Sequence, residues 1–362
     1  MMTEQDVYMR LREHLDGLPV GFPSTESGVE LRILRELFTE EEAEMACQLT
    51  PFPETAADIA GKIGQDVKDV EALLEQMSSK GLIFNARKGG TTTYRASWFV
   101  VGIFEYQVNR MSKKFVEAFD QYVEEGLRDE LVGYETHQLR VVPVNKAVNA
   151  IKHVASFDDA RNLIKMQSKI SVQNCICKQK KDLQGGKCSR IEEREICLAF
   201  STGAYYYLEH GLGRELTQDE ALALLDFAEE KGLVVSPGNA QKPFAMCLCC
   251  GDCCEILTNL KKYPKPSSMI DSSYHARVDA DSCTGCETCL DRCQMDAISI
   301  VDGIATIDLD RCIGCGLCVT TCPEEALSLQ RKAENKLVVP PADGNDLYMK
   351  IGTERLQRRS SP

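Results

Sequence analysis

The sequence predicts a multidomain α+β protein, because its helical, cysteine-rich and repeated segments follow one another along the chain. Its 362 residues are enough for two or three domains with separate hydrophobic cores. Seventeen of its 18 cysteines lie after residue 170, so the two halves differ in chemistry. The predicted boundaries are residues 1–126 for an N-terminal domain, 127–155 for a linker, 156–275 for a mostly helical cysteine-rich domain, 276–330 for a small α+β domain and 331–362 for a C-terminal tail.

The N-terminal domain shows three helical patterns and then two strand-like segments. The helical patterns are GVELRILRELFTEEEAEMACQL, FPETAADIAGKIG and QDVKDVEALLEQMSSKGLI. LIFNAR and TTTYRASWFV follow, joined by a KGG turn. This order resembles a winged helix-turn-helix domain. A further helix over FEYQVNRMSKKFVEAFDQYVEEG is of the kind that makes dimer or domain contacts, so a homodimer through this domain is one expectation.

The charge of this region argues against nucleic acid as a partner. Residues 1–130 carry 14 Lys and Arg against 24 Asp and Glu, and only Arg87, Lys88 and Arg95 in the predicted wing favour DNA. A DNA-binding domain normally has the opposite balance. We therefore expect a module for protein docking or dimerisation.

The chain shows no export or membrane signal. Its N-terminus, MMTEQDVYMRLREHL, lacks the apolar core of a signal peptide, and no run of about 18 apolar residues occurs. We expect a cytoplasmic protein without a membrane span. Disulfides are disfavoured in a reducing cytosol, so metal–thiolate chemistry is the leading explanation of the cysteines.

An internal repeat is the strongest signal in the sequence. CTGCETCLDRCQMDAISI recurs 29 residues later as CIGCGLCVTTCPEEALSL, and each copy spaces its cysteines as C-x-x-C-x-x-C-x-x-x-C. The repeat resembles the bacterial two-cluster ferredoxins, in which the fourth cysteine of each run binds the other cluster. The resemblance implies two 4Fe–4S clusters, one held by Cys283, Cys286, Cys289 and Cys322 and the other by Cys312, Cys315, Cys318 and Cys293.

Zinc explains the repeat less well, because four ligands would complete a tetrahedral site and leave the duplicated runs of four unexplained. One position departs from the ferredoxin pattern. Pro323 follows Cys322, but Gln294 stands after Cys293 where a second proline is expected. The glutamine adds a backbone N–H that could bond a cluster sulfur and tune its potential.

Nine cysteines of the middle domain remain, and five of them lie within CLCCGDCC. A further iron–sulfur cluster, or two, is the leading interpretation because of the adjacent repeat, with zinc or buried thiols as alternatives. The side chains of consecutive residues diverge, so the loop is expected to face two sites or to spare thiols for another role. The nine candidates are Cys175, Cys177, Cys188, Cys197, Cys247, Cys249, Cys250, Cys253 and Cys254.

Residues 156–330 also resemble the 4Fe–4S binding proteins of anaerobes that carry CxC and CxCCxxCC segments. The matching segments are NCICK, CLAFSTGAYYYLEHGLGRE, EEKGLVV, CLCCGDCC and the two CxxCxxC runs. That family implies redox function but supplies no single reaction.

The leading functional hypothesis is an electron-transfer protein that exchanges electrons with a partner oxidoreductase through two clusters and a further middle-domain cluster. One alternative is an oxidoreductase that binds its substrate at the third cluster. The other is a redox-sensing winged-helix transcriptional regulator. Duplex binding that depends on salt would favour the regulator.

Overall fold

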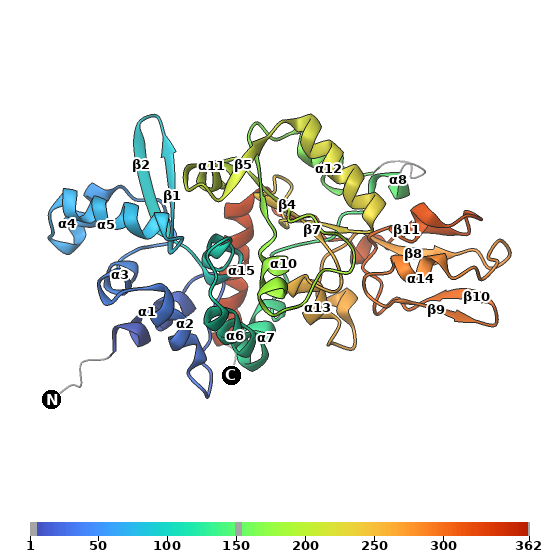
Figure 1. Cartoon of the computed structure of the whole chain (residues 1–362), viewed down its shortest axis with the longest axis horizontal. Coiled ribbons are helices and arrows are strands. Elements are labelled where there is room, and N and C mark those ends of the chain that lie inside the picture. The colour runs from blue at the N-terminus through green and yellow to red at the C-terminus, as the bar shows by residue number, and fades with distance from the viewer. Residues whose placement is uncertain (1–5, 149–153, 361–362) are drawn as a thin grey trace. The chain divides into compact units, whose positions relative to one another are not determined.

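The computed structural model describes residues 6–148 and 154–360, and the chain divides into two compact units (Figure 1). The predicted linker includes residues 149–153, which lie outside the described residues. Unit 1 comprises Met1–Thr136, Tyr205–Leu212 and Tyr348–Pro362, and unit 2 comprises His137–Ala204 and Gly213–Leu347. No helix in the two described ranges is both long and apolar enough to cross a membrane.

Unit 1 contains helices and one hairpin in the predicted order. Thr39 and Thr55 each form a capping box that starts a helix. The hairpin turns at Gly89 and Gly90, both with positive φ, as predicted for KGG. The winged-helix resemblance itself stays a prediction. The elements are α1 Val7–Asp16, α2 Val29–Leu37, α3 Glu40–Ala46, α4 Ala56–Ile63, α5 Val67–Ser79, β1 Ile83–Lys88, β2 Thr91–Ala96, η1 Phe99–Ile103, η2 Glu105–Gln107, α6 Lys113–Tyr122, η3 Val123–Leu127 and α7 Arg128–Val132.

The predicted C-terminal tail contains a helix that the sequence analysis did not predict. α15 spans Gly344–Ser360, and its last part belongs to unit 1. There the ring of Tyr348 lies 3.8 Å from that of Trp98, and buried Arg355 donates to Glu130 at 2.6 Å. Sequence analysis missed this helix because its apolar residues are sparse, so only tertiary contacts identify its packed face.

Unit 2 contains a five-stranded antiparallel sheet in the region predicted to be mostly helical. The strand order is β5-β3-β4-β7-β6. The sheet was not predicted, because several of its strands are buried along most of their length and lack the alternation that identifies a half-exposed strand. The segment REICLAFSTGAYYYLEHG, for example, is a strand followed by a helix. The elements are β3 Ile170–Asn174, β4 Glu195–Phe200, α11 Thr202–Glu209, β5 Gly213–Leu216, β6 Val234–Pro237 and β7 Ala245–Cys249.

The helices of unit 2 begin and end at polar caps. Thr217 and Glu220 form a capping box at the start of α12, and Gly232 ends that helix with φ 75°. α9 is capped by Asp159, whose side chain accepts from the N–H groups of Arg161 and Asn162, and Ser156 starts a short 3-10 turn. The helices and turns are α8 Asn145–Val148, η4 Ser156–Asp158, α9 Ala160–Lys165, α10 Ile176–Leu183, α12 Gln218–Lys231, α13 Glu255–Leu260 and η5 Pro266–Ser268.

The predicted linker is not a free connection where it is described. Val142 forms an isolated bridge with Val235, and Arg140 pairs with Asp158 at 2.9 Å with both side chains almost fully buried. The sequence does not reveal this buried ion pair, because its two residues are 18 positions apart and meet only in the folded chain.

The C-terminal part of unit 2 is a small α+β domain built from two antiparallel ribbons, β9 with β10 and β8 with β11 (Figure 1). Its elements are β8 Tyr274–Val278, α14 Thr288–Arg292, β9 Ile298–Val301, β10 Ile304–Ile307, η6 Val319–Thr321, β11 Leu327–Arg331 and η7 Glu334–Lys336.

Candidate metal centres

The C-terminal domain repeats its own structure with the 29-residue offset of the sequence. Ala305 of β10 lies opposite Ile300 of β9, and Ala276 of β8 lies opposite Leu329 of β11. The two pairs are equivalent under the repeat, because position 305 follows position 276 by 29 residues and position 300 precedes position 329 by 29 residues. Each ribbon therefore pairs the start of one copy of the repeat with the end of the other copy. This pairing places the last cysteine of each run near the first three cysteines of the other run.

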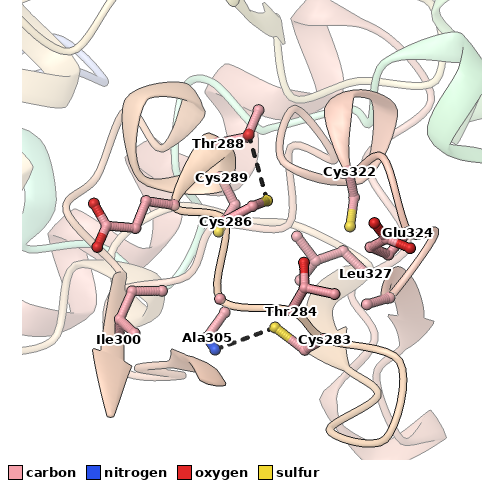
Figure 2. Close-up of a pocket in the computed structure, with 13 residues that line it drawn as sticks. Cys283, Thr284, Cys286, Thr288, Cys289, Ile300, Ala305, Cys322, Glu324 and Leu327 are labelled. Carbon is pink, nitrogen blue, oxygen red and sulfur yellow. Dashed lines mark hydrogen bonds between the residues drawn. The ribbon is translucent and has the colours of Figure 1, made fainter. Parts of the chain in front are cut away.

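The first predicted cysteine set surrounds one hollow (Figure 2). The hollow has a volume of about 350 Å³, part of it open to solvent, and Ile300, Ala305 and Leu327 contribute apolar wall. Two of its cysteines come from the loop that leads into α14, a third lies in the first turn of that helix, and the fourth follows η6. The four cysteines that line it are Cys283, Cys286, Cys289 and Cys322.

The second predicted set is more deeply buried. Burial raises the pKa of Cys318, and the charges of its predicted partners Cys315, Cys312 and Cys293 raise it further. Burial likewise raises the pKa of Cys315 to about 12. Thiols that burial and neighbouring charge keep neutral ionise more readily beside a cation, which suits a metal cluster.

Backbone N–H groups point at the cysteine sulfurs in both copies. The N–H of Ala305 donates to Cys283 Sγ at 3.4 Å, and the N–H of Ala276 donates to Cys312 Sγ at 3.3 Å. These two bonds are related by the 29-residue offset. Such bonds withdraw charge from a ligating sulfur and favour the more reduced state of a cluster.

Two glycines allow the backbone to wrap this closely. A Cβ on Gly285 would lie 2.1 Å from the Gly303 carbonyl oxygen, and a Cβ on Gly314 would lie 2.1 Å from the Tyr274 carbonyl oxygen. Both glycines have positive φ, at 66° and 68°. Any other residue would push the cysteine loop away from the strand beneath it.

Six of the nine middle-domain cysteines form one continuous network. Cys197 and Cys247 are partners across β4 and β7, and Cys249 is on the same face of β7 as Cys247. Cys254 contacts both Cys249 and Cys177, and those hydrogen bonds lower its pKa, helped by N–H groups of the first turn of α13. The thiols contact one another in the order Cys175, Cys177, Cys254, Cys249, Cys247, Cys197.

The other three middle-domain cysteines gather with a carboxylate. The Sγ atoms of Cys188, Cys250 and Cys253 and a carboxylate oxygen of Asp252 all lie within 4.8 Å of one another. The CLCCGDCC loop thus faces two sites, as the divergence of consecutive side chains predicts. Cys249 and Cys254 face the first group, and Cys250 and Cys253 face the second.

A buried lysine donates hydrogen bonds to two sulfurs of this second group. Lys178 is 1% exposed, and its Nζ donates to Cys188 Sγ at 2.6 Å and to Cys250 Sγ at 3.1 Å. Burial opposes the charge of this amine, but the negative charge of Cys250 and the hydrogen bonds to both sulfurs raise its pKa. The hydrogen bond with Cys253 and the charge of Lys178 lower the pKa of Cys250 to about 7, so the buried ammonium has a negatively charged partner at this sulfur.

The cysteine loop is joined to the repeat domain at Gln294. Its Oε1 accepts a hydrogen bond from the Gly251 N–H at 2.8 Å, and the side chain is 4% exposed. A Cβ on Gly251 would lie 2.1 Å from the Gln294 carbonyl oxygen. The glutamine that replaces the expected proline therefore acts through its side chain, whereas sequence analysis considered only its backbone N–H.

Sequence reasoning missed Lys178 and Asp252 as members of the second group. Lys178 begins a KQKK run, a pattern typical of a solvated helix face. Asp252 lies between four cysteines, and no motif distinguishes it as a possible ligand. No local spacing marks Lys178, because the two cysteines that it contacts are 10 and 72 positions away in the sequence.

Residues 276–329 match the family model described as a 4Fe-4S dicluster domain. The C-terminal domain is thus ferredoxin-like and of the iron–sulfur class. No match was found among curated proteins or among solved structures. The resemblances of the N-terminal region to winged helices and of the middle region to an anaerobe family stay predictions.

Proposed function

We propose that this protein transfers electrons between its iron–sulfur clusters and a partner oxidoreductase. The observation that supports this proposal best is the duplicated cysteine arrangement of residues 276–329. In each copy a backbone N–H donates a hydrogen bond to the sulfur of the first cysteine. A bound 4Fe–4S cluster supplies one-electron redox chemistry. The chain supplies thiolates, apolar walls and N–H groups that set how easily that chemistry occurs.

The residues fit two clusters. The hollow of Figure 2 is lined by four thiols, and the buried second set has the same composition. The proposed ligands are those of the ferredoxin resemblance, with Cys322 completing the first set and Cys293 the second. Glycines at 285 and 314 give the close backbone approach that both sets require.

A third cluster is proposed at the six-thiol network. A 4Fe–4S cubane needs four thiolates, and this network offers six. They come from β4, β7 and α10 and from the N-cap positions of α10 and α13. Cys197 and Cys247 come from adjacent strands, whereas Cys177 comes from α10. The Gly251–Gln294 hydrogen bond connects this loop to the residue after Cys293, which gives the middle and C-terminal sites a direct structural connection.

The partner is proposed to be a redox protein that docks by charge, since the chain carries a net charge of −13. Electron-transfer contacts are small and guided by electrostatics. The density of thiols suits a reducing compartment, and we propose the cytoplasm.

The contacts of the hairpin weigh against the regulator alternative. Arg87 pairs with Glu75 at 2.8 Å and with Glu209 at 3.3 Å, and Arg95 lies 4.7 Å over the ring of Phe84. These two cations thus have acidic or aromatic partners within unit 1 that compete with phosphate for them.

The test is the iron and sulfide content of the full chain purified without oxygen. We expect about twelve irons per chain, and about eight would remove the third cluster from the proposal. Cys289→Ala and Cys318→Ala should each lose about four irons, and so should Cys249→Ala. Cys47→Ala is the matched control, because that half-buried thiol belongs to unit 1, whereas every proposed ligand belongs to unit 2.

If Cys289→Ala and Cys318→Ala keep all their iron, the proposed ligand sets are wrong. If the wild-type chain holds no iron after anaerobic purification and reconstitution with iron and sulfide, the electron-transfer proposal fails.

A further inference from the structure

Cys188, Cys250, Cys253 and Asp252 have the geometry of a single-ion site. Cys188 Sγ lies 3.7 Å from Cys250 Sγ, and the Oδ1 of Asp252 lies 3.4 Å from Cys253 Sγ and 4.0 Å from Cys188 Sγ. A tetrahedral zinc with Zn–S of about 2.3 Å and Zn–O of about 2.1 Å sets edges of about 3.8 Å between sulfurs and about 3.6 Å between sulfur and oxygen. The four ligand atoms are thus already spaced for one ion.

Asp252 is arranged so that one oxygen remains directed at the thiols. Its Oδ2 accepts from the Ser189 N–H at 2.8 Å and from Lys181 Nζ at 3.1 Å. These bonds hold the carboxylate in place and lower its pKa against the effect of burial. Oδ1 then faces Cys188 and Cys253, as a metal-ligating carboxylate held by other groups should.

The local charges also balance around a divalent ion. Three thiolates and one carboxylate around a 2+ ion leave a net charge of −2. Lys178, buried against two of the sulfurs, and Lys181, paired with the carboxylate, supply two positive charges. A buried site of this kind would be costly without such compensation.

The site is distinct from the six-thiol network. Within the described residues that form it, Cys250 contacts Cys188 and Cys253, whereas Cys249 contacts Cys247 and Cys254. The alternation of the backbone at positions 249 and 250 sends the two neighbours to different sites.

We propose that Cys188, Cys250, Cys253 and Asp252 bind one divalent ion of the zinc class, with Lys178 as its charge-compensating neighbour. Thiolates with one carboxylate in a closed tetrahedron suit zinc in a structural role. The ion would fasten the segment around Cys188 to the Cys250–Cys253 turn. That turn carries Gly251, so the ion would also hold the loop against Gln294 beside the second cluster set.

The test measures zinc and iron together in the full chain, purified without oxygen from cells supplied with both metals. Wild type should hold one zinc per chain. Cys188→Ala and Asp252→Ala should lose that zinc and keep the iron of the wild type, and Cys47→Ala should keep both. Cys249→Ala should show the opposite pattern, with iron lost and zinc kept.

Lys178→Met offers a second test that leaves all four ligands in place. We expect it to release zinc to a chelator at least tenfold faster than wild type, with unchanged iron content. Lys262→Met is the control, since that lysine is exposed to solvent at the end of α13.

Loss of iron rather than zinc from Cys188→Ala would assign these thiols to a cluster and overturn the single-ion site. A wild-type chain without zinc, whose mass shows a Cys250–Cys253 disulfide, would replace it with a redox dithiol. Either result is distinguishable from failure of the third cluster, because the six-thiol variants report that cluster independently.

Discussion

The Oε1 of Gln294 accepts a hydrogen bond of 2.8 Å from the N–H of Gly251, and this contact joins the cysteine loop of the middle domain to the residue that follows Cys293. The second copy of the repeat has Pro323 at the equivalent position, which lacks a polar side chain. The two halves of the repeat thus differ where one of them meets the rest of unit 2.

The close approach at this contact predicts the effect of Gly251→Ala. The added Cβ would lie 2.1 Å from a backbone oxygen, so the loop must shift and the hydrogen bond to Gln294 must lengthen or break. We expect a cost of about 1–3 kcal/mol, as for a buried polar group left without its partner. Hydrogen–deuterium exchange of peptides covering residues 247–256 should become faster.

Gly61→Ala is the matched control, because nothing lies within 4 Å of a Cβ at that position in α4. It should stabilise the chain by about 0.5–1 kcal/mol through helix propensity. Unchanged exchange in Gly251→Ala would mean that the loop tolerates separation from Gln294.

The pseudo-symmetry of the repeat predicts that Gly285→Ala and Gly314→Ala behave alike. Each new Cβ would meet a backbone carbonyl oxygen at 2.1 Å, so each variant should retain less iron than wild type. Gly303→Ala has a positive φ of 78° but open space around its Cβ, and it should cost only the backbone strain of about 1–2 kcal/mol. Iron content after one anaerobic gel filtration separates the three variants. Equal iron in Gly285→Ala and Gly303→Ala would contradict the role given to the carbonyl contact.

The acidic N-terminal unit predicts weak binding to duplex DNA. Its hairpin arginine Arg87 is already paired with two glutamates, so few cations remain to displace counterions from phosphate. Fluorescence anisotropy with a mixed-sequence duplex at about 150 mM salt should show no binding at micromolar protein. Binding that falls steeply with salt and is lost in Arg87→Ala would instead revive the regulator hypothesis.

His210 predicts a pH dependence of stability. Its Nε2 lies 3.2 Å from both Ser78 Oγ and Asn85 Oδ1, and burial lowers the pKa of His210 below its ordinary value of 6.5. The unfolded chain then binds the proton more tightly than the folded chain. The stability contributed by the neutral ring is present above pH 6.5 and is lost as the pH falls through the lowered pKa.

Thermal unfolding of wild type and His210→Gln at pH 7.5 and pH 5.5 checks this sign. The wild type should lose more stability than the variant over this interval, and the difference isolates His210 from the similarly buried His14. Equal losses would show that His210 titrates alike in both states.

The amino-acid sequence determined the iron–sulfur character of this protein. Cysteine ligands within one run are close in the chain, so their spacing alone predicts the dicluster domain that residues 276–329 match. The same holds for local features such as the capping box at Thr217 and the Gly89–Gly90 turn, which depend on residues a few positions apart.

Only the tertiary structure decided how the nine other cysteines divide. Cys197 and Cys247 are fifty positions apart in sequence and meet through the register of β4 and β7. Cys188 reaches Cys250 across a fold that the sequence did not reveal, because those strands are buried without alternation. Contacts between distant segments depend on strand pairing and packing, and the residue spacing within one segment predicts neither of them.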